Sequence, residues 1–261
     1  MGILNTTPDS FSDGGRYLKT EHAWNHAQMM LFEGADIIDV GGESSRPGAN
    51  PVSVKDEIER VLPVIKKIRK NSNVPVSIDT CKSEVAEQAL NEGADWINDI
   101  SGLTQDQKMV EIVQKWDCPV IIMHKKGIPK TMQDNPYYDD VVNEVADFFT
   151  DRINVLDEYG IDKIILDPGI GFGKRTEDNV LLLKNLHVFK KFGFPLLVGT
   201  SRKSLIGTLT GKKVGDRLAG SLALTTWSII NGTSIVRVHD VSETKDTLNI
   251  INSLLNCVKE T

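Results

Sequence analysis

The fold of this chain is decided by a short apolar run, ADIIDVGG at residues 35–42, which ends in a pair of glycines. Near-continuous aliphatic and β-branched runs of this length are typical of parallel strands that are buried on both faces. Seven further runs of the same kind occur along the chain. They read MGILN, PVSIDT, DWINDI, PVIIMH, KIILDPG, PLLVGTS and SIVRVHD, at residues 1–5, 75–80, 95–100, 119–124, 163–169, 195–201 and 234–240.

Segments with a helical pattern separate these runs. Four of them end at glycine, a common residue just beyond a helix C-terminus: 22–35, 83–94, 141–160 and 218–232. Eight strands alternating with helices in 261 residues predict an α/β fold, a single-domain (β/α)8 TIM barrel spanning residues 1–261. A doubly wound sheet is the alternative, but eight evenly spaced units favour closure. We expect flexible active-site loops at about 6–20 and 42–54, where a barrel carries its function.

The composition excludes several classes of partner. Hydrophobic residues make up 40% of the chain, and the formal net charge of −6 argues against a nucleic-acid surface. No apolar run approaches the ~20 residues needed to cross a bilayer, and no secretory signal is visible. Cys81, Cys118 and Cys257 are widely spaced, as expected of thiols in a reducing compartment. We therefore expect a cytoplasmic protein that binds neither membrane nor nucleic acid.

Polar side chains end almost every predicted strand. In a barrel these C-terminal ends converge on one mouth, so the residues become neighbours. Asp99, Asp240 and Ser201 are explained by helix capping or by bonds to loop amides. Capping explains the whole set poorly, because a buried carboxylate without a partner is costly. The set is Asn5, Asp79, Asn98, Asp99, His124, Asp167, Ser201, Arg237 and His239.

These residue types suit a planar heterocycle with an anionic tail. Asp79, Asn98 and Asp167 can accept bonds from ring N–H groups. Arg237 and Lys203 supply a planar cation for stacking and an ammonium for a ring carbonyl or nitrogen. A phosphate or pyrophosphate with a hard cation fits the remaining polar residues. These are Asn5, Ser45, Arg46, Arg237 and His239.

Seven segments carry a family resemblance, in strand order and over nearly the whole chain. They are GILNTTPDSFSDGG, GADIIDVGGESSRPGA, VSIDT, INDISG, LDPGIGFGK, TSRKS and RVHD, at residues 2–15, 34–49, 76–80, 97–102, 166–174, 200–204 and 237–240. The chain thus resembles the bacterial dihydropteroate synthases of the pterin-binding enzyme family. The resemblance implies a transferase of folate biosynthesis that uses Mg²⁺. Its substrates would be 6-hydroxymethyl-7,8-dihydropterin pyrophosphate and 4-aminobenzoate, and its products 7,8-dihydropteroate and pyrophosphate.

The resemblance also implies a role for each site residue. The pterin would be held by Asp79, Asn98, Asp167, Lys203 and Arg237, with Met123 lining the apolar floor. The diphosphate and Mg²⁺ would contact Asn5, Ser45, Arg237 and His239. The aminobenzoate would lie against Phe11, Pro47, Phe172 and Lys203, with its carboxylate near Ser204. Asp13 would reach the site on the first loop, as a catalytic residue beside Arg46, Lys203, Arg237 and His239.

Other interpretations of single features were weighed against these roles. The segment GIGFGK (169–174) lacks the spacing of a phosphate-binding loop, so we interpret it as a flexible loop whose ligand contact is Phe172. Cys81 is interpreted as a packing residue, not a nucleophile. A zinc site from His124 and His239 is conceivable, but no ligand spacing supports it.

Two other functions and a dimeric assembly are also compatible with parts of the sequence. A methyltetrahydrofolate corrinoid methyltransferase shares the barrel and the pterin aspartates, but it would not need the first loop or the TSRKS segment. A non-catalytic pterin-binding protein would be favoured by loss of Lys203 or Arg237, which are both present. The helix expected at 215–233 is apolar around most of its circumference, and family members are dimers through this region. We therefore expect a homodimer, and inhibition by sulfonamides, which resemble aminobenzoate.

Overall fold

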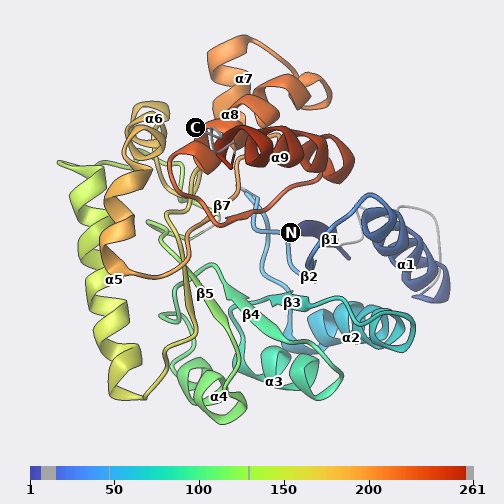
Figure 1. Cartoon of the computed structure of the whole chain (residues 1–261). Coiled ribbons are helices and arrows are strands. Elements are labelled where there is room, and N and C mark those ends of the chain that lie inside the picture. Colours follow the sequence, from blue (N-terminus) through green and yellow to red (C-terminus); the bar gives the residue numbers. More distant parts are fainter. Residues whose placement is uncertain (7–15, 47, 129, 257–261) are drawn as a thin grey trace.

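The computed structural model describes residues 1–6, 16–46, 48–128 and 130–256. Within these ranges, eight parallel strands form a ring that is surrounded by helices (Figure 1). The strands are β1 (Gly2–Asn5), β2 (Ile38–Gly41), β3 (Val76–Asp79), β4 (Trp96–Asp99), β5 (Val120–Met123), β6 (Ile164–Asp167), β7 (Leu197–Val198) and β8 (Ile235–Val236). Each lies inside one of the eight predicted runs.

The helices alternate with the strands along the chain, as predicted. They are α1 (Arg16–Phe32), α2 (Val54–Asn71), α3 (Ser83–Asn91), α4 (Lys108–Trp116), α5 (Val141–Glu158), α6 (Thr176–Lys184), α7 (Ser204–Thr210), α8 (Leu218–Ile230) and α9 (Val241–Leu255), with 3₁₀ helices η2 (Leu186–Phe192) and η3 (Val214–Asp216). Helix α1 begins at Arg16, so the expected loop at 6–20 is too long at its C-terminal end. The second loop ends as predicted, because Ser53 caps α2 by accepting a bond from the Asp56 amide.

Backbone hydrogen bonds close the sheet into a barrel. Strands β1 to β6 pair in sequence order and β7 pairs with β8. The Leu166 amide donates to the Pro195 carbonyl at 2.9 Å, which joins β6 to the segment entering β7. The Ile3 amide donates to Val238 at 3.0 Å, which joins β1 to the end of β8. A doubly wound sheet would leave these edges apart, so the barrel is confirmed.

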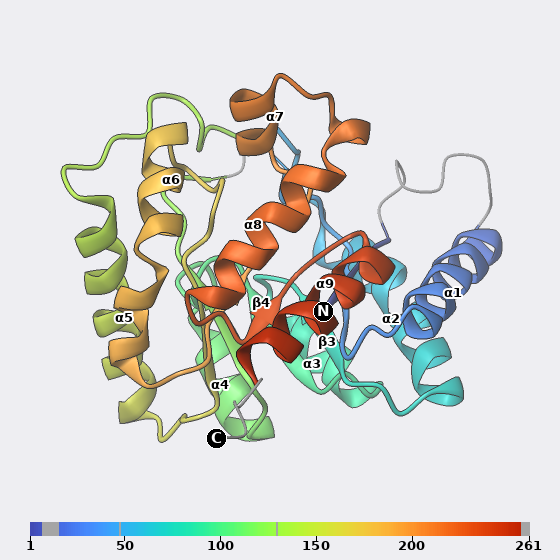
Figure 2. The same cartoon turned by 45° about the horizontal axis from the view of Figure 1, so that its top comes forward.

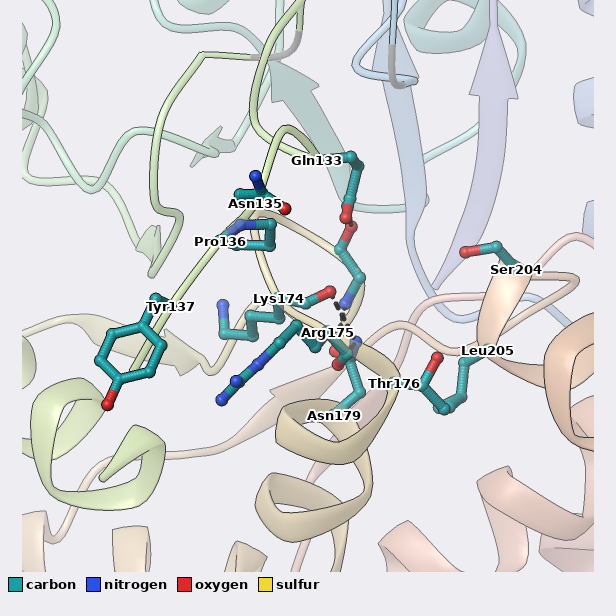
Figure 3. A pocket seen from close by; sticks show the side chains of 11 residues that line it. Gln133, Asn135, Pro136, Tyr137, Lys174, Arg175, Thr176, Asn179, Ser204 and Leu205 are labelled. Atoms are coloured by element: carbon teal, nitrogen blue, oxygen red, sulfur yellow. Dashed lines mark hydrogen bonds between the residues drawn. The ribbon is translucent and has the colours of Figure 1, made fainter. Parts of the chain in front are cut away.

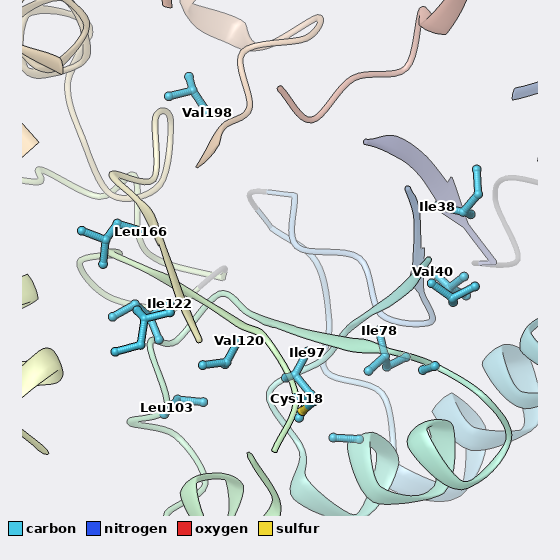
Figure 4. Packing of buried hydrophobic residues seen from close by; sticks show 14 of the residues in the cluster. Ile38, Val40, Ile78, Ile97, Leu103, Cys118, Val120, Ile122, Leu166 and Val198 are labelled. Carbon is cyan, nitrogen blue, oxygen red and sulfur yellow. The ribbon is translucent and has the colours of Figure 1, made fainter. Parts of the chain in front are cut away.

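The strands separate two hydrophobic clusters. Successive side chains in a strand point to opposite faces, and Val120, Ile121 and Ile122 accordingly belong to alternate clusters. The larger cluster packs the outer face of the strands against the helices (Figure 4). The smaller one is Met1, Ile37, Ile121, Ile165 and Leu197. The inward positions nearer the C-terminal strand ends are therefore available for polar residues.

Glycines end the helices at the predicted positions. Gly34, Gly93, Gly160 and Gly232 follow α1, α3, α5 and α8, and their φ angles of +91°, +103°, +68° and +96° lie in the left-handed region that side chains with a Cβ rarely adopt. None of the described helices is long and apolar enough to cross a membrane. The polar strand ends and α7 lie at one end of the barrel, toward the top of Figure 2.

Candidate active site at the barrel mouth

The centre of the mouth is a network of charged side chains around Arg237. Its Nε donates to Asp39 Oδ2 at 2.6 Å, and its Nη2 donates to Asp79 Oδ2 at 2.7 Å. Asn98 donates from Nδ2 to the same Asp39 oxygen at 3.1 Å. Asp79 and Asn98 are direct neighbours in register at the ends of β3 and β4. Three of the predicted pterin residues are thus brought together.

Asp39 was not among the predicted site residues. It lies within β2 and is 0% exposed. Its Oδ1 has no hydrogen-bond partner among the residues that the structure describes. The sequence did hold a signal for it, because Asp39 is a carboxylate inside an apolar strand, between Ile38 and Val40. Such a residue must face the barrel interior and find a partner there.

Burial changes the protonation of the two carboxyl groups that face the mouth. Burial raises the pKa of Asp79 to about 7, against the opposing charge of Arg237. Burial also raises the pKa of Asp167, and Lys203 opposes this shift. Asp167 Oδ1 accepts a bond from the Gly169 amide at 2.8 Å. At neutral pH the Asp79 group therefore exchanges between a carboxylate, which accepts, and a carboxylic acid, which also donates.

Lys203 lies over the aromatic ring of Phe172. Its Nζ is 4.7 Å from the ring centroid and donates to the carbonyl of Ile170. Burial lowers the Lys203 pKa to about 8, although Asp167 opposes the shift. Lys203 therefore carries its charge at neutral pH, between the pterin residues and the predicted aminobenzoate residues.

His239 is held by Ser201. The Ser201 hydroxyl accepts a bond from the His239 amide at 3.2 Å and lies 3.1 Å from Nδ1. Burial, followed by the charge of Arg237, lowers the His239 pKa to about 4. Arg46 contributes to the same shift, so the two side chains lie close enough to interact. His239 is consequently a neutral donor or acceptor at physiological pH.

The capping interpretation of three strand-end residues is only partly right. Asp99 Oδ1 accepts a bond from the Ser101 amide at 2.6 Å, as predicted for a loop residue. Ser201 likewise accepts a bond from a backbone amide, that of His239, and it also lies beside the His239 ring. Asp240 precedes α9 without a side-chain capping bond, because its carboxylate pairs with Arg202. The last two residues thus support the mouth.

The loop GIGFGK is not the flexible segment that the sequence predicted. Lys174 is 3% exposed, and its ammonium donates to the carbonyls of His124, Gly169 and Phe172. The glycines alone indicate mobility, but the buried lysine fixes the loop against the end of β5. Sequence reasoning missed Lys174 because nothing in its neighbours shows which way the side chain points.

The structure places the remaining predicted residues as follows. Met123 ends β5, is buried, and is in register with Asp167. Asn5 ends β1, where its Oδ1 and Asp79 Oδ2 both lie within 4 Å of the position that a Cβ on Gly41 would occupy. Ser45 and Arg46 lie on the loop after β2, outside the Arg237 network. Three more predictions fall outside the described residues: Phe11, Asp13 and Pro47.

Two alternatives are not supported by this arrangement. No three His, Cys, Asp or Glu side chains of the described residues could hold a metal ion together. His124 is buried edge-on against Phe148, with ring centroids 5.0 Å apart, and burial lowers its pKa to about 2. Within the described part of the chain, His124 therefore lies among aromatic rings and not in a metal-binding cluster. Burial raises the pKa of the Cys81 thiol, as expected of a packing residue and not of an activated nucleophile.

A cavity of about 500 Å³ lies beside the loop that carries Phe172 (Figure 3). The loops after β5 and β6 and the start of α7 form its walls. Its position next to Ser204 is the predicted end of the aminobenzoate site. The lining residues are Gln133, Asn135, Pro136, Tyr137, Gly171, Lys174, Arg175, Thr176, Asn179, Ser204 and Leu205.

Comparisons with known proteins agree with this geometry. Residues 1–239 match a family model described as pterin binding enzyme. The chain is 46% identical over 257 residues to the dihydropteroate synthase of Synechocystis sp., covering 97% of this chain and 89% of the relative. It is 46% identical over 258 residues to the Escherichia coli dihydropteroate synthase, covering 98% and 91%.

Solved structures give the same result. A dihydropteroate synthase of Yersinia pestis in complex with a sulfonamide drug is 44% identical, with a TM-score of 0.93 over 98% of this chain and 94% of that one. The Xanthomonas albilineans dihydropteroate synthase with 4-aminobenzoic acid is also 44% identical, with a TM-score of 0.93 over 99% and 93%.

Proposed function

Because this chain belongs to the pterin binding enzyme family, we propose a role in catalysis for each residue at the barrel mouth. The activity is that of a dihydropteroate synthase of folate biosynthesis. It joins 6-hydroxymethyl-7,8-dihydropterin pyrophosphate to 4-aminobenzoate and releases pyrophosphate. The observation that carries the assignment of roles is the Arg237 network, which places two carboxyl groups and Asn98 around one guanidinium.

The pterin ring binds over this network. Asp79 and Asn98 face its N–H edge from neighbouring strands, and Asp167 faces it from β6. Arg237 packs against the ring, and its orientation is fixed by Asp39 and Asp79. A guanidinium held at two of its nitrogens loses little freedom when the ring binds, so the site is preorganised.

The diphosphate binds on the side of the mouth that holds His239. Neutral His239 can donate to a phosphate oxygen, because its backbone and Nδ1 are held by Ser201. Arg46 lies near enough to add positive charge. The Asn5 carboxamide oxygen fits Mg²⁺, which binds through few protein oxygens when substrate phosphates supply others. When bound, Mg²⁺ would neutralise charge on the departing pyrophosphate.

The amine attacks from the Phe172 side, with Lys203 between the two substrates. An aniline nitrogen is neutral at pH 7, so no strong base is required to begin the attack. The nitrogen bonds to the exocyclic CH₂ of the pterin, and the C–O electron pair leaves with the pyrophosphate. Electron donation from the dihydropterin into the CH₂ favours C–O cleavage before attack. Asp79 and Asp167 then stabilise the cationic pterin, and the new secondary amine loses its proton.

An isotope experiment tests the order of these bond changes. Oxygen-18 placed in the C–O–P bridge of the pterin substrate is expected to scramble into non-bridging positions without aminobenzoate, because the C–O bond breaks reversibly. Absence of scrambling in an enzyme that turns over with aminobenzoate would show that cleavage requires the amine.

The activity is tested with purified protein. Pyrophosphate release is expected with Mg²⁺ and both substrates, and Asp167→Ala or Lys203→Ala should abolish it. The exposed Lys66→Ala variant serves as the matched control and should retain full activity. Binding of the pterin without turnover by the unchanged protein would favour the non-catalytic alternative. We also expect competitive inhibition by sulfonamides against 4-aminobenzoate.

The quaternary structure that we propose is a homodimer through α6 and α8. Val180 and Leu181 on α6 and Trp227 and Ile230 on α8 are exposed apolar side chains, and Trp227 Nε1 ties the two helices together by donating to the Leu183 carbonyl at 2.8 Å. An exposed apolar patch of this kind marks an interaction site. The proposed location is the cytoplasm, since Cys81 and Cys118 are free thiols.

A further inference from the structure

The loop between β6 and α6 is held at every carbonyl from Gly169 to Gly173. Lys174 Nζ donates to Gly169 at 2.9 Å and to Phe172 at 3.2 Å. Three other side chains hold the carbonyls between and after them. They are Lys203 on Ile170, Gln133 on Gly171 and Tyr138 on Gly173. Loop carbonyls usually bond to water, so a run of five carbonyls held by four side chains indicates a loop whose position matters.

Lys174 differs from the other donors because it also bonds to a carbonyl outside the loop. Its third bond is to the His124 carbonyl at 3.2 Å, at the end of β5. Its three N–H groups thus connect one strand end to two points of the loop. Gln133 and Tyr138 each make one of these carbonyl bonds, and both are neutral. Figure 3 shows the Lys174 side chain in the cavity wall, on the same side as Arg175 and facing away from Ser204.

The loop backbone packs closely against the backbone that follows β5. Gly169 and Gly173 have φ angles of +64° and +62°. A Cβ on Gly169 would lie 1.9 Å from the His124 oxygen, and one on Gly173 would lie 2.0 Å from the Lys126 oxygen. The loop therefore lies directly against the backbone that follows β5, and the carbonyl of Phe172 itself accepts a bond from Lys174.

Stability alone gives little reason for a buried ammonium here. No carboxylate of the described residues forms an ion pair with Lys174, and burial lowers its pKa to about 7. A buried charge without a direct ion pair is destabilising compared with an apolar side chain of similar size, and Asp167 and Asp178 only partly oppose the effect of burial. The function of the Lys174 side chain is to hold the backbone in place, because its one nitrogen bonds to three carbonyls that belong to the loop and to the end of β5.

We propose that Lys174 is the positioning residue of the amine-substrate site: by fixing the loop Gly169–Gly173 against β5, it sets the place of the Phe172 ring against which 4-aminobenzoate lies. This inference rests on the proposed function of Phe172. Three of the pterin residues are anchored differently, since Asp79, Asn98 and Arg237 come from β3, β4 and the end of β8 and do not contact the Lys174 ammonium. Asp167 and Lys203 do bond to the loop, but each comes from its own element and is not held by Lys174.

The test compares the two substrates in Lys174→Met, which keeps the size of the side chain and removes all three donors. The KM for 4-aminobenzoate is expected to rise about tenfold or more. The Kd of the pterin pyrophosphate, measured by calorimetry with Mg²⁺ and without the amine, should change by about twofold at most. A change that affected only folding would lower the fraction of active protein and leave both constants alone.

Matched variants sharpen the result. Lys115→Met removes an exposed lysine of α4, whose Nζ pairs with Glu87, and should leave both constants unchanged. Tyr138→Phe removes one neutral bond to the loop Gly169–Gly173 and should raise the amine KM less than Lys174→Met does. If Lys174→Met does not fold, Lys174→Gln, which retains one amide donor group, replaces it with the same expected split.

Three outcomes would overturn the inference: equal changes in both constants, no change in either, or an equal effect of Lys115→Met. Failure of the proposed function would be recognised separately, because the unchanged protein would then release no pyrophosphate at all. A protein that turns over but shows no split between the two constants rejects the role of Lys174 alone.

Discussion

At the scale of single residues, Asp39 connects two of the residues at the barrel mouth. One of its oxygens accepts bonds from both Arg237 and Asn98, from opposite sides of the barrel interior. The carboxylate is fully buried, so its charge is matched by Arg237 and not by water. In the proposed binding mode, Asp39 would act on the pterin through Arg237 and Asn98, the two residues that it holds.

The first prediction concerns Asp39→Asn. Asparagine fills the same space but removes the charge that holds Arg237. We expect kcat/KM for the pterin substrate to fall ~100-fold, equivalent to about 2–3 kcal/mol for a charged hydrogen bond. Ser77→Ala is the control, because Ser77 is the register neighbour of Asp39 on β3 and its buried hydroxyl has no partner among the described residues. Equal effects of the two substitutions would contradict the positioning role.

The second prediction concerns the protonation of Lys174 and stability. Its pKa is lowered from 10.5 to about 7 in the folded protein. Between these pH values the unfolded chain binds the proton and the folded protein does not, so raising the pH stabilises the fold. The free energy of unfolding of the wild type should therefore rise, relative to Lys174→Met, by a few kcal/mol between about pH 7 and 10.

Urea unfolding across this pH range measures the effect. Taking the difference between wild type and Lys174→Met cancels the other titrating groups that both proteins share. Parallel curves for the two proteins would show that Lys174 keeps its ordinary pKa in the folded state.

At the scale of elements, the loop after β2 is held at its base by a buried ion pair. Lys82, which precedes α3, contacts the carboxylates of Glu43 in this loop and Glu57 in α2. Glu57 is 1% exposed. Burial lowers the pKa of Lys82, but the bonds of Lys82 to Glu43 and Glu57 outweigh this effect and raise the pKa. The loop that carries Ser45 and Arg46 therefore begins from a fixed point.

The third prediction tests this fixed point with Lys82→Met. Removing the lysine leaves Glu57 buried and unpaired, which should lower the free energy of unfolding by about 3–5 kcal/mol. Lys66→Met is the control, since Lys66 forms an exposed pair with Glu92 and should contribute less than about 1 kcal/mol. Denaturant midpoints measure both. A similar loss for the two variants would mean that the Glu57 charge is already relieved in another way.

At the scale of the whole molecule, the fourth prediction concerns assembly. Ile230→Lys places a charge in the exposed apolar patch of α6 and α8 and should convert a dimer to monomer, because an unpaired charge is costly in an apolar interface. Phe32→Lys is the control: Phe32 is 94% exposed on α1, across the barrel from α6 (Figure 1). Sedimentation velocity reports the state. A monomeric wild type, or a dimeric Ile230→Lys protein, would contradict the proposal.

Much of the fold could be predicted from the sequence because its signals are local. The eight apolar runs contain the eight strands, and the glycines after α1, α3, α5 and α8 stop these helices where expected. The strand pattern placed Asp79, Asn98, Asp167 and Arg237 at the mouth, where they lie in the structure. The sequence analysis missed Asp39 and Lys174, and its interpretation of residues 169–174 as a flexible loop was wrong.

The sequence by itself determined the order of the elements, the segments that contain the strands and the end of the barrel at which polar side chains gather. These follow from periodicity, backbone preferences and the parallel direction of the strands, which act over a few residues. Only the tertiary structure decided which groups pair. Arg237 meets Asp39 and Asp79 across 198 and 158 residues of chain, and Lys174 meets His124 across 50. Such pairs exist only because closure of the barrel brings β8 beside β1 and the loop after β6 against the end of β5.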